Sequence, residues 1–436
     1  MPSQYNAHAH CFTMQHVPEE FFFCFGPLGK ILRISKLKHK HSLNRLFAGL
    51  LTRSWIIAIF SIFSNKRAGD LRRLKGLLKY EDEPAQLGMI KTLSDVYGDD
   101  FGFILLSMDL DEMGAGNAVA PFLQQLEELR EEKESGKYAD RIFPFIFADP
   151  RRIGVSDLVK KYITNPLASF SGIKIYPAIG YYPFDKDMRS VYEFAVSKNV
   201  PLLTHCIDGV VYFRKELQHD PKYANHPITN KPALKGSPSV FQLNFTHPLN
   251  YECLLNQEIL KRFWGDGAPD LQSLKLCIGH FGGASEWDLA IRQEKMLQRT
   301  RYRNLRIMSN QPLDIYQPWF GSSGQRLSWL TIIKALLVKY SNLYADISFT
   351  LAEDNFHFDE LKKMLKDPAI NRRILFGTDF YVVSTIKPEN EIWKLIQQSM
   401  TPKEIDMLTK TNPADFLNPL VNNYPLVAEG TLDAIQ

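Results

Sequence analysis

The sequence predicts one (β/α)8 TIM barrel, and two observations support this. Eight short, apolar, β-rich runs are spread along the 436 residues, and segments with helical periodicity lie between most of them. Eight strand–helix units in one chain favour a closed barrel over an open sheet. Because no internal repeat or interdomain linker is visible, we expect residues 1–436 to form a single domain.

The predicted strands follow one another at uneven intervals. They cover residues 4–10, 101–109, 141–148, 171–177, 200–206, 274–280, 342–348 and 373–380. The helical pattern between them is clearest at residues 118–136, 185–199 and 327–341.

Two long insertions explain the uneven spacing. Residues 12–100 follow the first strand and are predicted to form a helical insertion, as a lid or subdomain. Residues 209–273 follow the fifth strand and contain a polar, proline-dotted stretch that predicts a long loop. Loops after barrel strands surround the active site, so both insertions are candidate lids.

The first insertion carries an unusual charge. Residues 30–79 contain thirteen Lys/Arg and one acidic residue, whereas the whole chain has a net charge of only +4. A solvated helix face is the plainer explanation, and a surface for anionic substrates or for a membrane is the alternative. Nucleic acid is not predicted, because no binding motif accompanies the charge. Residues 46–63 are as long as a membrane span, but Arg53 near their middle favours a buried or lid helix.

The cysteines and the N-terminus predict a cytoplasmic protein. The five cysteines form no CxxC pair, and Cys206 and Cys277 lie in apolar runs typical of buried, reduced thiols. The first residues lack the charged start and apolar core of a secretory signal. The oligomeric state stays open, a homo-oligomer included.

Polar residues interrupt the apolar runs at the ends of several predicted strands, where barrel enzymes place catalytic groups. His8 and His10 are two residues apart, so both side chains face the same side of the first strand. His205, His280 and Asp379 end the fifth, sixth and eighth strands. A single strand-terminal histidine is usually structural, but together these residues indicate a metal site.

Such ligands define the chemistry to expect. Imidazoles and a carboxylate suit zinc, with manganese or another divalent ion as alternatives. Zinc with an open coordination position lowers the pKa of a bound water to about 7, and a nearby carboxylate can then take up the proton.

At this point the chain resembles a known family. The segments NAHAHCF, SGIKIYPAIGYYP, PLLTHC, LCIGHFGG, LYADIS, ILFGTDF and TPKEIDMLTKTNPADFLN are similar to the amidohydrolase superfamily, in its amidohydrolase-related (amidohydrolase 2 type) branch of hydrolases and nonoxidative decarboxylases. The resemblance covers the barrel strands but not residues 12–100 or 210–250. It implies a metal-dependent barrel and leaves the substrate open.

The resemblance also implies residue roles. His8 and His10 would bind the first metal with Asp379, and His205 would join that site or bridge to a second ion. Asp379 would also accept the proton of the metal-bound water and pass it to the leaving group. His280 would complete a second metal site or, with one metal, polarise the substrate carbonyl or transfer a proton.

Four further residues keep two interpretations each. Lys174, in the fourth strand, is either carboxylated and bridging two metals, as in two-metal relatives, or a lysine that binds a substrate carboxylate or an ion-pair partner. Tyr176 and Asp208 are substrate contacts or ordinary hydrogen-bonded groups. Asp346 lines the barrel or holds a loop.

Other residues are expected outside the site. Cys11 and Cys206 should point toward the helices, because each follows a candidate ligand by one residue. The polar surroundings of five histidines predict that they are solvated: His39, His41, His219, His226 and His357.

The leading functional prediction is hydrolysis of a C–N or C–O bond in a small organic substrate. A metal-dependent decarboxylase with the same ligands is the alternative, and a barrel that only binds or scaffolds is a third.

Overall fold

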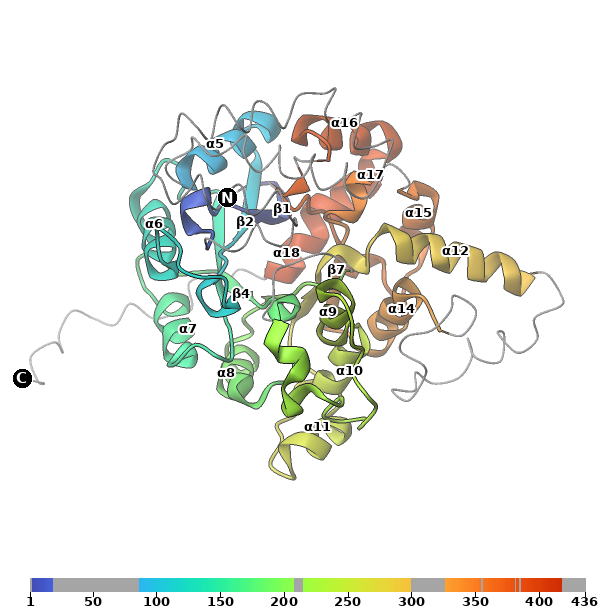
Figure 1. Cartoon of the computed structure of the whole chain (residues 1–436). Helices are drawn as coiled ribbons and strands as arrows, with labels where there is room; N and C mark the ends of the chain where they lie inside the picture. Colours follow the sequence, from blue (N-terminus) through green and yellow to red (C-terminus); the bar gives the residue numbers. More distant parts are fainter. Residues whose placement is uncertain are drawn as a thin grey trace, which may run out of the picture.

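Eight parallel strands follow one another around a barrel in sequence order, β1 to β8 (Figure 1). The computed structural model describes residues 2–18, 86–207, 215–298, 326–353, 356–380, 382–383 and 386–417. The strands are β1 Gln4–His10, β2 Phe101–Leu106, β3 Ile142–Phe147, β4 Gly172–Lys174, β5 Leu202–Leu203, β6 Leu276–Ile278, β7 Leu343–Asp346 and β8 Ile374–Leu375. Each lies within a predicted run, and every neighbouring pair is parallel, so the (β/α)8 prediction is confirmed.

Backbone hydrogen bonds between β1 and the segment that follows β8 close the barrel. The amide of Ala7 donates to the carbonyl of Phe376 at 2.8 Å, and the amide of Thr378 donates to the carbonyl of His8 at 3.2 Å. A parallel bridge then pairs Ala9 with Phe380. Closure therefore runs through the residues that carry the candidate ligands.

Helices surround the strands, as Figure 1 shows. The predicted helical segments 118–136, 185–199 and 327–341 contain α6 Phe122–Ser135, α8 Arg189–Lys198 and α14 Trp329–Lys339. The other α-helices are α5 Gln86–Tyr97, α7 Val155–Ile163, α9 Pro238–Thr246, α10 Leu249–Leu255, α11 Gln257–Trp264, α12 Ala284–Gln298, α15 Phe358–Lys366, α16 Glu389–Ser399, α17 Pro402–Asp406 and α18 Asn412–Leu417.

The segment after β5 differs from its prediction. A long loop was expected over residues 209–273, but the described part of that segment contains α9, α10 and α11. All seven residues of α10 are buried, among them Tyr251, Cys253 and Leu254. Two prolines of this segment stand at helix starts: Pro238, from the proline-dotted stretch, is the first residue of α9, and Pro248 precedes α10.

The apolar core has two layers. On β2, Phe103 and Leu105 belong to the layer that packs against the helices, whereas Ile104 and Leu106 belong to a second cluster inside the barrel. Alternate strand residues therefore face the two layers. Phe416 and Leu417 of α18 join the interior cluster, and the Phe416 ring lies 6.2 Å from that of Phe145 and 5.1 Å from that of Tyr344.

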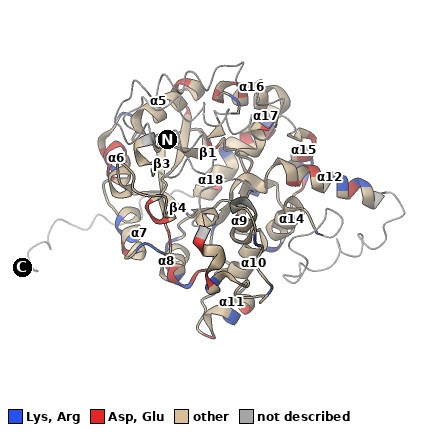
Figure 2. Ribbon diagram, viewed as in Figure 1, with Lys and Arg blue, Asp and Glu red and all other residues tan. Residues whose placement is uncertain are grey.

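The first insertion lies largely outside the described residues. Of residues 12–100, the structure describes 12–18 and 86–100, so the basic window 30–79 and the apolar stretch 46–63 are not among them. No helix in the described part of the chain has the length and apolar character of a membrane span. The described charged residues of both signs lie mainly on the outer helices and loops (Figure 2).

Candidate metal centre

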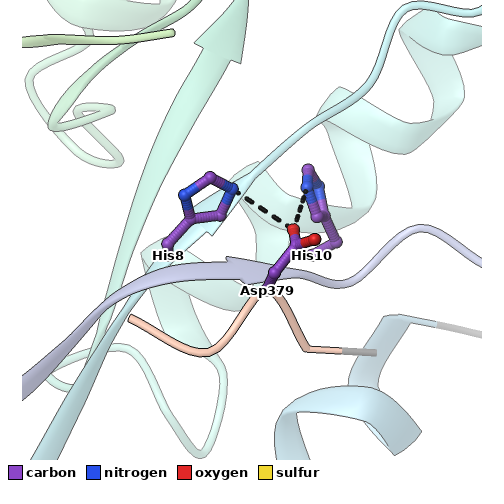
Figure 3. Close-up of side chains that lie close together, drawn as sticks. All are labelled: His8, His10 and Asp379. Carbon is purple, nitrogen blue, oxygen red and sulfur yellow. Dashed lines mark ion pairs between the residues drawn. The ribbon is translucent and has the colours of Figure 1, made fainter. Parts of the chain in front are cut away.

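Two imidazoles from β1 and one carboxylate from the segment after β8 meet at one point (Figure 3). The Oδ1 atom of Asp379 lies 3.3 Å from Nε2 of His8 and 3.1 Å from Nε2 of His10. All three side chains are buried. Ligand atoms about 2.0–2.1 Å from a tetrahedral zinc ion lie about 3.3 Å apart, so these separations match a shared ion.

Local backbone features bring these side chains together. The pairing of β1 with β2 shifts register between Asn6 and Ala9, a bulge of the kind that redirects a side chain such as His8. After β8, a Cβ on Gly377 would lie 2.6 Å from the Cβ of His8, so only glycine permits this approach. Asp379 follows with a left-handed backbone, φ 60°, and its amide donates to the carbonyl of His8 at 2.8 Å.

A second carboxylate, that of Asp346, contacts the other ring nitrogen of His8. Oδ2 of Asp346, the last residue of β7, lies 3.0 Å from Nδ1 of His8. The hydroxyl of Ser348 donates to Oδ1 of Asp346 and also lies 3.0 Å from Nδ1 of His8. A carboxylate bonded to the far nitrogen of a metal-binding histidine is a common outer-shell arrangement, because it fixes the orientation and tautomer of the ring.

The two other strand-end histidines contact each other. Nε2 of His280 lies 2.9 Å from Nδ1 of His205, and the ring centroids are 4.6 Å apart. His280 has φ 66°, and its amide donates to Oδ1 of Asp346 at 3.1 Å. Within the described residues, the ligand atoms of His280, Asp346 and His8 form a second group whose members lie within 4.8 Å of one another. His205 belongs to neither group.

Lys174 and Tyr176 lie beside this cluster. Lys174 is fully buried and its Nζ donates to the carbonyl of Thr204 at 3.2 Å. The ring of Tyr176 lies 4.2 Å from that of His205, and Nζ of Lys174 lies 5.6 Å from the centre of the Tyr176 ring. Asp208 lies outside the described residues. The roles predicted for Lys174, Tyr176 and Asp208 stay predictions.

The carboxylates of the centre are ionised. Burial alone would raise the pKa of Asp379, but the surrounding imidazoles of His280, His10 and His8 outweigh it and hold that pKa well below the ordinary value. Asp346 shows the same balance: burial opposes ionisation, yet the nearby His8 lowers the pKa. Both groups are therefore anionic acceptors at neutral pH.

The basic groups respond mainly to burial, which disfavours their charged forms. Burial lowers the pKa of His280 to about 3 and that of His205 well below its ordinary value. It also lowers the pKa of Lys174 to about 8, against the attraction of Asp379. For His8, burial is the largest influence and lowers the pKa, but the charge of Asp346 together with the contacts to Asp346 and Asp379 outweighs it, so the net shift is upward.

The residues present fit a divalent ion. Nε2 of His8 and Nε2 of His205 are buried and make no hydrogen bond within the described structure. Although Nε2 of His8 is close to Asp379, the geometry is not that of a hydrogen bond. Buried polar atoms normally have partners, so exceptions require an explanation, and an ion supplies one. Neutral imidazoles with a carboxylate are a typical zinc donor set.

Asp346 and Ser348 have a larger part in this site than the sequence predicted, and His226 is buried although it was predicted to be solvated. Asp346 was assigned either to the barrel lining or to a loop, and Ser348 was not singled out, although both lie in the segment LYADIS. Their signal was the alternation of polar residues at the end of β7. The prediction for His226 was wrong: it is buried, and its Nε2 lies 3.2 Å from Oδ1 of Asn250 in α10.

The cysteine predictions are confirmed. Cys11 and Cys206 are buried in the layer between barrel and helices, and their thiols donate to Oε1 of Gln86 at 3.1 Å and to the carbonyl of Thr246 at 3.2 Å. Cys206 and Cys277 are both buried and free of disulfide bonds.

Comparison with known proteins adds the following findings. No protein-family model and no curated protein matches the sequence. Among solved structures, the chain is similar to 5-carboxyvanillate decarboxylase from Sphingomonas paucimobilis, with 12% identity, a TM-score of 0.43 and 79% of this chain and 90% of the other covered. It is also similar to 2,6-dihydroxybenzoate decarboxylase from Rhizobium, with 16% identity, a TM-score of 0.41 and coverage of 76% and 87%.

A third structure covers more of the chain. For 4-oxalomesaconate hydratase from Rhodopseudomonas palustris the identity is 12%, the TM-score is 0.41, and 95% of each chain is covered. Matches at this level do not indicate an activity. The fold and the centre described above rest on the geometry of this chain.

Proposed function

We propose that this chain is a metal-dependent hydrolase that cleaves a C–N or C–O bond in a small organic substrate. One observation carries the proposal: Nε2 of His8 and of His10 converge within 3.3 Å on one carboxylate oxygen of Asp379 at the C-terminal end of the barrel strands. Barrel enzymes place their active sites at this end.

The chain supplies groups for binding an ion and for moving a proton, and Asp379 belongs to both sets. His8, His10 and Asp379 would hold the ion, with His205 as the candidate fourth ligand. A zinc ion held there acts as a Lewis acid and makes a bound water acidic near neutral pH. Asp379 is anionic and can accept a proton, while His280 is neutral and contacts Nδ1 of His205 through its Nε2 atom, so it can orient that ring.

Burial strengthens each of these contacts. The imidazoles and carboxylates of the centre are at most 6% exposed, so their interactions are little weakened by water. Lys174 adds a buried cationic group beside the histidines, suited to an anionic part of the substrate or to bridging two ions after carboxylation.

The decisive experiment combines metal analysis with turnover. We expect the purified protein to bind at least one zinc, manganese or cobalt ion per chain. It should hydrolyse a member of a panel of amides, lactones and esters, and both properties should be lost in Asp379→Asn. A panel of carboxylic acids assayed for CO2 release tests the decarboxylase alternative. Protein that binds no divalent ion, or turnover that survives chelation, would refute the metal-dependent proposal.

A further inference from the structure

A continuous chain of hydrogen bonds links Asp346 to three histidines. It runs from Nδ1 of His8 to Asp346, from Asp346 to the hydroxyl of Ser348, from Ser348 to Nδ1 of His280, and from Nε2 of His280 to Nδ1 of His205. An ionised carboxylate can only accept, and a neutral imidazole has one donor and one acceptor nitrogen. Starting from Asp346, the donor and the acceptor of each following hydrogen bond are therefore determined.

The first link fixes the tautomer of His8. Asp346 is acceptor-only when ionised, so the Nδ1 atom of His8 at 3.0 Å must be the donor. In the neutral ring, Nε2 is then the unprotonated nitrogen, and it is the buried atom that faces Asp379.

The second branch passes through Ser348. Its single hydroxyl proton is donated to Asp346, so toward the Nδ1 atom of His280, at 2.9 Å, the hydroxyl oxygen acts as acceptor. The main-chain carbonyl of Ser348 lies 3.3 Å from the same nitrogen and can only accept. Both contacts therefore place the proton of His280 on Nδ1.

The last link carries this choice to His205. With Nδ1 of His280 protonated, Nε2 of that ring accepts, and the donor at 2.9 Å is Nδ1 of His205. Nε2 of His205 is then unprotonated, and it is buried without a hydrogen bond in the described structure.

We propose that Asp346 and Ser348 are positioning residues that fix the Nδ1–H tautomers of His8, His280 and His205, and so present the Nε2 lone pairs of His8 and His205 to a bound divalent ion. The inference rests on the metal-dependent function proposed above. A single carboxylate thereby prepares two ligands that come from β1 and from the end of β5.

The alternative arrangement is a second ion held by His8, His280 and Asp346, whose ligand atoms are also close together. The hydrogen bonds argue against it. Oδ1 of Asp346 already accepts from the amide and hydroxyl of Ser348 and from the amide of His280, and Oδ2 accepts from His8. This carboxylate is saturated by protein donors.

The experiment uses three variants of the full chain. Asp346→Asn puts an NH2 group, which cannot accept, in place of one carboxylate oxygen. Because the amides of Ser348 and His280 hold the remaining carbonyl oxygen at the Oδ1 position, the NH2 group faces Nδ1 of His8. Ser348→Ala removes the hydroxyl acceptor of Nδ1 of His280 and a second contact of Nδ1 of His8, which keeps Asp346 as its acceptor. Thr350→Val is the matched control, because Thr350 is buried in the same segment and donates to the carbonyl of His280 at 2.5 Å without touching an imidazole ring. The readouts are histidine 15N chemical shifts in metal-free protein, which report tautomers, and Zn2+ and Co2+ dissociation constants from chelator competition.

We expect Asp346→Asn to weaken metal binding by about 10- to 100-fold, the range found for outer-shell partners of metal-binding histidines. Its spectra should show the Nε2–H form at His8, because an NH2 group beside Nδ1 requires that nitrogen to accept. Ser348→Ala leaves Nδ1 of His280 with only the longer contact to the carbonyl of residue 348, so we expect a mixture of tautomers at His280 and His205 while His8 keeps its own. Thr350→Val should stay within about twofold of wild type. A general loss of stability would not change the tautomer of His205 while leaving that of His8 unchanged.

Other outcomes would overturn the inference. Unchanged tautomers in Asp346→Asn and Ser348→Ala would do so, as would equal metal affinities in those variants and in Thr350→Val. Two ions per chain, one of them lost with Asp346, would make Asp346 a ligand instead. If Asp346→Asn does not fold, Ser348→Ala decides alone. Wild type without metal affinity refutes the proposed function, and the tautomers of metal-free protein still test this inference separately.

Discussion

Two sides of the barrel mouth differ in whether their buried polar groups have hydrogen-bond partners. After β2 and β3, each buried carboxylate is clasped by an arginine: Nη2 of Arg152 donates to Asp109 at 2.8 Å, and Arg151 donates to both oxygens of Asp149 at 2.8 and 2.6 Å. Around β1 and β5, Nε2 of His8 and of His205 make no hydrogen bond within the described residues. We call the first the satisfied side and the second the unsatisfied side, and we propose that the unsatisfied side binds an ion.

The largest expected effect concerns the unsatisfied side. His8→Ala should abolish metal binding and reduce turnover by about 1000-fold or more, because a catalytic metal contributes several kcal/mol. Metal content and steady-state kinetics measure this. His226→Ala is the control, since it also removes a buried histidine but one bonded to Asn250 away from the centre. Equal metal loss in both variants would contradict the division between the two sides.

The satisfied side should respond through stability. Arg152→Ala leaves Asp109 buried without its cation, and we expect the free energy of unfolding to fall by about 3 kcal/mol. Burial already raises the pKa of Asp109 to about 6 despite Arg152, so the loss should be smaller at pH 5, where this carboxyl takes up a proton. Denaturant titration at both pH values measures the difference. A change in metal affinity instead would show that the two sides are coupled.

Glu389 provides an intermediate case, a buried carboxylate with hydroxyl donors but no cation. Its Oε1 accepts from Tyr97 at 2.9 Å and Thr378 at 2.6 Å, and burial raises its pKa from 4.5 to about 7. A raised folded pKa means that the folded state binds the proton more tightly, so the contribution to stability falls as pH rises from about 4.5 to 7.

Glu389→Gln should remove this dependence. The variant should gain on wild type between those pH values by about 2 kcal/mol. This is somewhat less than the ~3 kcal/mol that the full shift represents, because the unfolded state is only half titrated at pH 4.5 and the folded state only half titrated at pH 7. Unfolding free energies measured from pH 4.5 to 8 provide the test. If the unfolding free energies of the two proteins run parallel with pH, the titrating group is not Glu389.

The smallest effects should come from two glycines, Gly377 on the unsatisfied side and Gly154 on the satisfied side. Gly377→Ala brings a Cβ within 2.6 Å of the Cβ of His8 and should weaken metal binding by about tenfold by displacing that ring. Gly154→Ala, in the loop after β3, meets no atom within 4 Å but has φ 74°, so it should cost about 1 kcal/mol of stability and leave metal affinity unchanged. A loss of metal affinity in Gly154→Ala and unchanged metal affinity in Gly377→Ala would contradict the comparison of the two sides.

The sequence predicted those parts of the molecule that depend on local periodicity. All eight strands were placed because apolar runs in parallel strands are continuous, and polar interruptions marked their ends. The contact between His10 and Asp379 followed from the same reasoning, since strand ends of a barrel converge.

What the sequence could not predict depends on long-range geometry. The register shift arises where β1 pairs with β2, and the left-handed backbone at Asp379 lies where the last segment pairs with β1. The hydrogen-bond network of Asp346 requires knowing which residues β6 and β7 bring together. The burial of His226 depends on α10 folding over a segment whose composition is that of a loop.

The closing pair of segments has a consequence for biosynthesis. The hydrogen bond from Asn6 to Thr378 joins residues 372 positions apart, so the two halves of the centre leave the ribosome at very different times. At roughly 5–20 residues per second, His8 and His10 wait roughly 20 to 70 s for Asp379. Until then a nascent chain has only the imidazoles of the proposed site, so we expect any ion to be bound late, after synthesis of the last barrel strand.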